Sequence, residues 1–277
     1  MKQKLRCVLA GLVMMCVHAL VAAEVTAATA EALMRKSGVW AQLGDVASQV
    51  KAGLVQSATG GALSPEESHR LNLIADAAFA PDRLREAVLQ VLSRSTTVAQ
   101  SANAFKWYDS AAGRQITAQE EAFSTSFNDM NQVISDGNKA LAQASANRQS
   151  LLSQTVQASR MAESMATLQI NTTVAVMQGL ANAMPNSAMS PALQMRKALE
   201  AQRPQMVAAS VGLALSMSAL TYQSVSDKAL AQYVKFLASK SGAALTATME
   251  EALVASLSQA AQRLGSGIPV APGATSL

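Results

Sequence analysis

Residues 107–121 read WYDSAAGRQITAQEE, and residues 236–250, which follow 129 positions later, read FLASKSGAALTATME. Both stretches contain an aromatic-x-x-Ser-x-x-Gly pattern, formed by Trp107, Ser110 and Gly113 and by Phe236, Ser239 and Gly242. The aromatic residue lies about one helical turn before the serine on the same face and is expected to pack inward. The glycine lets the chain turn or lets a neighbouring backbone approach. Each motif is therefore expected to end one helix and begin the next, in a packing role rather than a catalytic one.

The repeat extends beyond this motif. Ser64-Pro65 recurs as Ser190-Pro191 at a displacement of 126 residues. The small difference between the two displacements is what drift in loop length would produce. The sequence therefore predicts an internal duplication of roughly residues 34–124 and 160–253. Further matching positions are Val50, Gly53 and Leu54 with Val176, Gly179 and Leu180, and Ile116 and Thr117 with Leu245 and Thr246.

The composition favours helices. Of the 277 residues, 55 are alanine and only 4% are aromatic. Alanine and unbranched side chains favour helices, and strands are usually richer in aromatic and β-branched residues. Half of the residues are apolar and the net charge is small, which argues against disorder. We predict an all-α fold in which two related multi-helix units are joined by a long helix.

Hydrophobic spacing and helix start and stop signals locate the predicted helices. Ser64 and Glu67 form a capping box in which each binds a backbone N–H of the other. Residues 136–138 (Asp-Gly-Asn) indicate a turn, and Pro204 is expected to interrupt the chain. The expected helices are 25–36, 39–56, 65–79, 82–92, 96–109, 114–134, 191–201, 205–221, 227–238 and 243–264.

One segment is predicted to form an unusually long helix. Residues 139–184 contain no proline and a single glycine, Gly179. An unbroken helix over this range would be on the order of 65 Å long. A single break near residues 149–155 is the alternative.

The first residues have the pattern of a secretory signal peptide. A basic start and an apolar run precede Val21-Ala22-Ala23, where a cleavage site is expected. An uncleaved anchor and lipid attachment through Cys16 are the less favoured alternatives. The predicted organisation is a signal peptide over 1–23, a first helical unit over 24–137, a connecting part of the long helix over 138–159, a second helical unit over 160–264 and a disordered tail over 265–277.

Cleavage after residue 23 would change the composition of the chain. Cys7 and Cys16 would be removed, so the mature protein would have no disulfide or thiolate site. Three of the 22 Lys and Arg residues, but none of the 18 acidic ones, would also be removed. The mature chain would be close to neutral, because the basic pI of the full sequence comes largely from the signal peptide. We therefore expect no nucleic-acid partner. An exported protein without cysteine is suited to the bacterial periplasm.

Few catalytic chemistries fit the mature sequence. His69 would be its only histidine, and we expect it to be solvated. One histidine without cysteine cannot complete a structural zinc site, and no phosphate-binding loop, dinucleotide fingerprint or nucleophile elbow is present. No metal or cofactor is therefore expected. The pairs Glu120-Glu121 and Glu250-Glu251 are interpreted as charged faces in the first turns of helices.

Methionine is the feature that could mark a binding surface. Eight methionines lie between residues 161 and 217. Methionine is flexible and polarizable and accepts varied apolar partners. We favour the interpretation that these residues fill gaps in an alanine-rich core, as the apolar segment 206–220 also would. The alternative is a groove for an apolar peptide or lipid, with Met161, Met165, Met177, Met206 and Met217 as its candidate residues.

The run Trp107-Tyr108-Asp109-Ser110-Ala111-Ala112-Gly113-Arg114 resembles the core motif of a bacterial family of exported helical proteins, a domain of unknown function. The run 233–242 resembles the same core in a second copy, although Ala243 replaces the basic residue that follows the glycine. The opening from Ala32 to Gly38 is also similar to that family. The resemblance implies a helical fold and export, and it implies no known activity, cofactor or catalytic residue.

These observations predict an exported, periplasmic, non-enzymatic binding or interaction protein of the bacterial cell envelope. A protein, a peptide and a lipid all remain open as its partner, and self-association is also open. The alternative function is binding of lipid or a membrane surface through the 206–220 segment or the methionine-rich faces. An enzyme that uses carboxylates alone is the third and least favoured hypothesis, and its candidate residues are Glu120, Glu121, Glu250 and Glu251.

Overall fold

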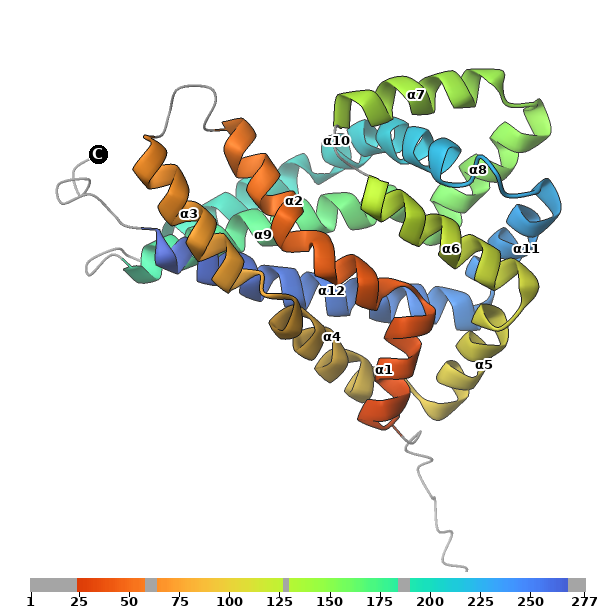
Figure 1. Ribbon diagram of the computed structural model, residues 1–277, viewed down its shortest axis with the longest axis horizontal. Coiled ribbons are helices and arrows are strands. Elements are labelled where there is room, and N and C mark those ends of the chain that lie inside the picture. Colours follow the sequence, from red (N-terminus) through yellow and green to blue (C-terminus); the bar gives the residue numbers. More distant parts are fainter. Residues whose placement is uncertain (1–23, 58–63, 127–129, 184–189, 269–277) are drawn as a thin grey trace, which may run out of the picture.

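The computed structural model describes residues 24–57, 64–126, 130–183 and 190–268. The described chain is helical, apart from short connections and an isolated bridge between Glu24 and Thr97, so the predicted all-α fold is confirmed. The predicted signal peptide lies outside the described residues. In chain order (Figure 1) the helices are α1 (Ala27–Lys36), α2 (Val39–Ser57), α3 (Pro65–Ala78), α4 (Pro81–Ser95), α5 (Val98–Tyr108), α6 (Ala111–Ser126), α7 (Met130–Gln143), α8 (Ala146–Ser159), α9 (Met161–Ala183), α10 (Ser190–Thr221), α11 (Asp227–Leu237) and α12 (Lys240–Gly267).

Local capping signals begin several of these helices. The Ser64 backbone N–H donates to Glu67 Oε2 at 2.7 Å, and the Glu67 N–H donates to Ser64 Oγ at 3.3 Å, which is the predicted capping box of α3. Thr97 and Gln100 form a second capping box at the start of α5, which the sequence reading missed. Such caps satisfy backbone donors that the first turn of a helix leaves unpaired.

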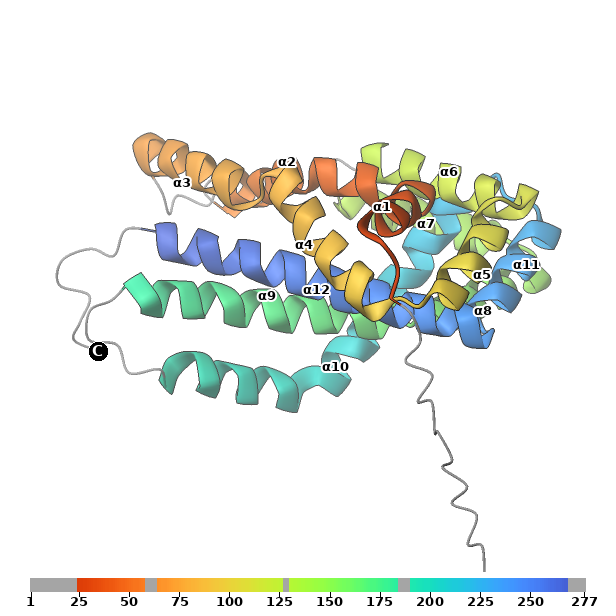
Figure 2. The ribbon, with the colours of Figure 1, turned by 90° about the horizontal axis from the view of Figure 1, so that it is seen from below.

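The C-terminal helix α12 belongs to the core of the N-terminal helices. It packs against α9 on one side and is crossed by α4 on another (Figure 2). Ala252 and Ala260 of α12 share one buried apolar cluster with residues of α1 to α4, among them Leu84 and Leu92. The fully buried Ser256 hydroxyl donates to the Leu84 carbonyl at 3.0 Å. The first four described helices and the last one therefore share a common core.

Two glycines bring α9 and α12 into backbone contact. A Cβ on Gly179 would lie 2.1 Å from the Gln262 carbonyl oxygen, and one on Gly265 would lie 2.2 Å from the Val176 carbonyl oxygen. This contact extends α12 beyond its predicted end, so residues 265–267 of the predicted disordered tail are helical. Residues 269–277 of that tail lie outside the described residues.

The predicted long helix over 139–184 is instead divided between the end of α7, all of α8 and all of α9. Ser145 caps α8 by accepting from the Arg148 N–H at 3.2 Å, and Arg160 ends α8 in the left-handed region with φ 54°. Neither break involves the glycine or proline that usually marks one. Gly137, which was read as a turn, lies inside α7, where a Cβ would come 2.3 Å from the Ser216 carbonyl oxygen. This glycine permits α7 to touch α10.

Helix α10 differs from its prediction in two ways. It continues through Pro204, where a break was expected, and it changes direction along its length (Figure 2). The 206–220 segment was expected to be buried, but Val211 is 41% exposed and only the last turns of α10 are largely buried. From Ala192 to Thr221, α10 is long and apolar enough to cross a membrane. Core helices of soluble proteins can meet the same criteria of length and composition.

The two aromatic-x-x-Ser-x-x-Gly motifs form corners with the same local geometry. Each follows an 11-residue helix, α5 or α11, and leads into a longer one. Ser110 Oγ accepts from the Gly113 N–H at 2.9 Å, and Ser239 Oγ accepts from the Gly242 N–H at 3.0 Å. A Cβ on either glycine would lie within about 2 Å of the aromatic residue's carbonyl oxygen, so both positions require close backbone approach. Duplication of the whole units stays a prediction.

Candidate ligand-binding cavity

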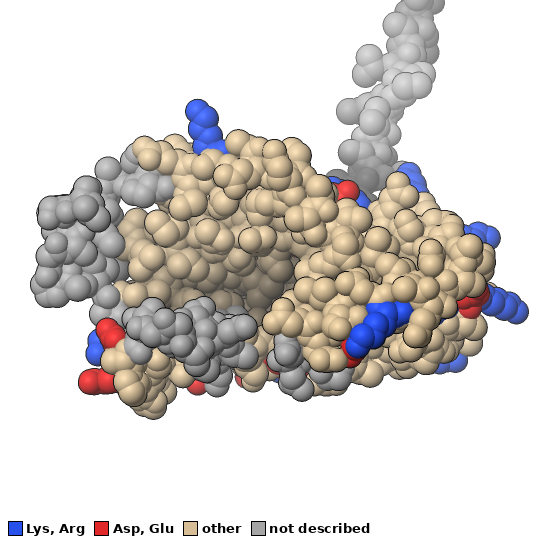
Figure 3. Space-filling view, turned by 90° about the horizontal axis from the view of Figure 1, so that it is seen from above, with Lys and Arg blue, Asp and Glu red and all other residues tan. Residues whose placement is uncertain are grey.

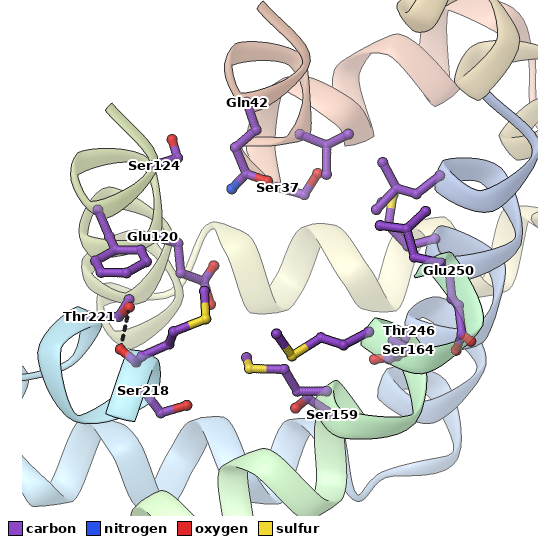
Figure 4. A pocket seen from close by; sticks show the side chains of 18 of the residues that line it. Ser37, Gln42, Glu120, Ser124, Ser159, Ser164, Ser218, Thr221, Thr246 and Glu250 are labelled. Atoms are coloured by element: carbon purple, nitrogen blue, oxygen red, sulfur yellow. Dashed lines mark hydrogen bonds between the residues drawn. The ribbon is translucent and has the colours of Figure 1, made fainter. Parts of the chain in front are cut away.

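A cavity of about 780 Å³ lies between α2, α6, α9 and α12 and reaches the ends of α10 and α11. Its walls are mainly apolar. Figure 3 shows a hollow near the middle of one face of the molecule, and the described residues drawn at its edge are neither Lys, Arg, Asp nor Glu. Figure 4 shows cavity-lining side chains from close by. The methionines on its walls are Met130, Met161, Met165, Met217 and Met249.

Three of the five methionines that the sequence singled out line this cavity. Met161 and Met165 come from α9 and Met217 comes from the last turns of α10. Met177 and Met206 do not line it. The cavity methionines Met130 and Met249 were missed because they lie outside the methionine-rich stretch.

The carboxyl group of Glu120 on α6 lies at the wall of this cavity. Its Oε1 accepts a hydrogen bond from the Tyr222 hydroxyl at 2.7 Å and another from the Tyr233 hydroxyl at 3.0 Å. Figure 4 shows the carboxyl group pointing toward the cavity. Glu120 was expected on a charged surface, and this expectation is wrong because α6 faces α11 and the end of α10 at this position.

Burial changes the ionisation of this cluster. Desolvation raises the pKa of Glu120, and the negative charge of neighbouring Glu121 raises it further, although the two tyrosine hydrogen bonds act in the opposite direction. Burial and the nearby Glu120 charge also raise the pKa values of Tyr222 and Tyr233 well above the usual value of 10.0. The tyrosine hydroxyls therefore remain hydrogen-bond donors at neutral pH.

The two corner motifs hold Tyr233 in position. The Trp107 ring stacks on Tyr233 with centroids 5.6 Å apart, and on Phe236 with centroids 4.8 Å apart. Tyr222 meets Tyr233 edge to face at 5.9 Å. The aromatic residues of both motifs are therefore packed directly behind the Glu120 cluster. Parallel and edge-to-face contacts of this kind restrict the orientation of the rings.

The other three glutamates that the sequence singled out lie in different environments. Glu250 lies across the cavity from Glu120, on α12 (Figure 4). Glu121 adjoins the α1–α2 turn, where its Cγ would lie 3.0 Å from a Cβ on Gly38. Glu251 is exposed, and so is His69, as expected for a solvated histidine. Glu120 and Glu250 thus share one cavity, and their neighbours in sequence do not.

The charges on the cavity wall have one sign. Among the described lining residues Glu120 and Glu250 are acidic, and none is lysine, arginine or histidine. Within the described part of the chain no cluster of three or more His, Cys, Asp or Glu side chains could hold a metal ion. The remaining polar groups on the wall include the hydroxyls of Ser159, Ser164 and Thr246 (Figure 4).

No family model, curated protein or solved structure matches this chain. The resemblance of the corner motifs to a family of exported helical proteins therefore stays a prediction.

Proposed function

We propose that this chain is a non-enzymatic protein of the bacterial cell envelope that binds an apolar small molecule in the cavity between α2, α6, α9 and α12. The observation that carries the proposal is the cavity itself, with its volume of about 780 Å³ and its methionine, leucine and aromatic walls. Small-molecule sites are mostly apolar clefts of about 300–1,000 Å³ with a few polar groups. Flexible methionines suit a ligand of varied apolar shape.

The polar groups on the wall support binding rather than catalysis. A hydroxyl nucleophile needs an adjacent base, and histidine and lysine are the usual ones. Neither type is found among the described lining residues. The Glu120 carboxyl group accepts from two tyrosine hydroxyls of high pKa, an arrangement that positions a charge or a hydrogen bond. Export and a periplasmic location remain part of the proposal and depend on the pattern of residues 1–23.

A matched pair of tryptophan variants tests this proposal. Leu168 lines the cavity on α9, whereas Leu193 on α10 is 71% exposed and does not line it. The neutral fluorescent dye Nile red should bind the wild-type protein and the Leu193→Trp variant with similar affinity. Leu168→Trp should weaken dye binding because the larger indole occupies part of the cavity, while circular dichroism confirms that the variant is folded. Equal dye binding by both variants would place the binding site elsewhere.

Binding to a membrane surface is the second candidate, and the exposure of α10 favours it. Leu193 and Val211 project from a helix that is apolar over most of its length. Co-sedimentation of the protein with neutral liposomes should fall in a Leu193→Ser, Val211→Ser variant if α10 lies in the membrane surface. If the wild-type protein does not co-sediment with these liposomes, membrane binding is excluded and the cavity proposal is unaffected.

A further inference from the structure

We propose that the ligand is an amphiphile with a cationic head, an amine or quaternary ammonium group that is held by Glu120, whose carboxyl group the hydroxyls of Tyr222 and Tyr233 orient. The inference rests on the proposed function and specifies the class of its ligand. Its basis is the charge of the cavity and the geometry around Glu120.

The charge of the cavity is complementary to a cation. Glu120 and Glu250 line it on opposite sides, and no described basic residue lines it with them (Figure 4). Glu120 forms no salt bridge with any described residue. A fatty acid would bring a second carboxylate close to Glu120 without a basic partner, and burying like charges together is costly. A cationic head would instead supply the missing counter-charge.

The hydrogen bonds of Glu120 leave a position for such a head. Both tyrosine hydroxyls donate to Oε1, at 2.7 and 3.0 Å. A carboxylate has about four acceptor positions on its two oxygens, so Oε2 remains for the ligand. The carboxyl group points into the cavity (Figure 4). The tyrosines therefore orient Glu120 and do not use up its capacity to bind.

Aromatic rings stand beside this carboxyl group. The planes of Tyr222 and Tyr233 meet at 68°, so the two rings form a corner at the wall of the cavity. Trp107, stacked on Tyr233 with an interplanar angle of 8°, restricts the position of that ring. A carboxylate that is fixed in this way is chemically suited to an ammonium group, and the methionine and leucine walls are suited to its alkyl chain.

Cation binding should be coupled to release of a proton. The groups that face Glu120 are Tyr108 from α5, Tyr222 after α10, Tyr233 from α11 and Glu121 on α6 itself, with Glu250 across the cavity on α12. Burial keeps Glu120 protonated to a higher pH than an exposed glutamate. A cation needs the ionised form, so its affinity should rise with pH through the range in which Glu120 of the free protein loses its proton.

Three probes with the same twelve-carbon chain test the inference. Dodecyltrimethylammonium and dodecanoate, each below its critical micelle concentration, and dodecanol, below its solubility limit, compete with Nile red at pH 7.5. The ammonium compound should bind at least tenfold more tightly than dodecanol, and dodecanoate should bind most weakly. The affinity of the ammonium compound should fall at acidic pH, although its own charge does not titrate. Calorimetry in buffers of different ionisation enthalpy should show that its binding releases a proton.

Two conservative variants locate the effect. Glu120→Gln should weaken binding of the ammonium compound at least tenfold and so remove the preference for it over dodecanol, while circular dichroism confirms that the variant is folded. Glu251→Gln, which alters an exposed carboxylate on α12, should leave all three affinities unchanged. If dodecanoate binds wild-type protein as tightly as the ammonium compound, or Glu120→Gln keeps the preference, the inference is wrong while the cavity proposal stands. If no probe binds and Nile red does not bind, both proposals fail.

Discussion

Replacing Gly179 with alanine should separate α9 from α12. The added Cβ would lie 2.1 Å from the Gln262 carbonyl oxygen, a distance that real Cβ atoms do not reach, so the helices must move apart by roughly 1 Å. Overpacking of this kind costs about 3 kcal/mol, which exceeds the gain of about 1 kcal/mol from alanine's higher helix propensity. For a chain of this size the net loss lowers Tm by about 5 °C.

Gly212 is the matched control for this substitution. It lies in α10, and a Cβ there would meet no atom within 4 Å. Gly212→Ala should therefore raise Tm by about 2 °C through helix propensity alone. Thermal unfolding followed by circular dichroism at 222 nm measures both variants. A Gly179→Ala protein that melts at or above the wild-type temperature would refute the backbone contact between α9 and α12.

A double substitution extends the test. Gly265 makes the reciprocal contact, with its added Cβ 2.2 Å from the Val176 carbonyl oxygen. Because the helices need to separate only once, Gly179→Ala with Gly265→Ala should cost clearly less than the sum of the two single changes. Strict additivity would mean that the two glycines do not report on one shared contact.

Two further predictions concern charged groups around the cavity. Glu120 has a raised pKa in the folded protein, so the native state holds a proton that the unfolded chain has lost. The free energy of unfolding should therefore decline as the pH rises above the ordinary glutamate pKa. Urea unfolding between pH 4 and pH 8 should show this decline in the wild type and a flatter profile in Glu120→Gln. Arg148 on α8 donates hydrogen bonds to the carbonyls of Tyr222 and Val225 and to the Asp227 carboxylate. Arg148→Met should lower the free energy of unfolding by about 1–3 kcal/mol because it leaves buried acceptors unpaired. It should also weaken Nile red binding because Tyr222 is then held less firmly. The Arg148 bonds lower the pKa of Asp227, so this loss should be largest above the ordinary aspartate pKa and shrink as pH falls; a pH-independent loss would contradict the assignment.

The local sequence alone does not determine the structural role of a glycine. Around residue 113 the motif predicted a helix boundary, and the boundary lies just before it, because α5 ends at Tyr108 and α6 begins at Ala111. At residue 137 the same residue type was read as a turn, although it lies inside α7 against Ser216. Glycine serves both turns and close helix contacts, and the partner that decides between them lies far away in the chain. The breaks before Ser145 and at Arg160 were missed for a related reason, since neither contains glycine or proline.

The all-α fold, the capping box at Ser64 and the starts and ends of most helices could be read from the sequence, because helix propensity and capping depend on residues within a few positions of one another. Residue type also pointed to the methionines Met161, Met165 and Met217. The cavity and the burial of Glu120 were decided by the tertiary structure alone. Hydrophobic periodicity marks a buried face but does not identify what covers it, and the tyrosines that cover Glu120 come 102 and 113 residues later in the chain.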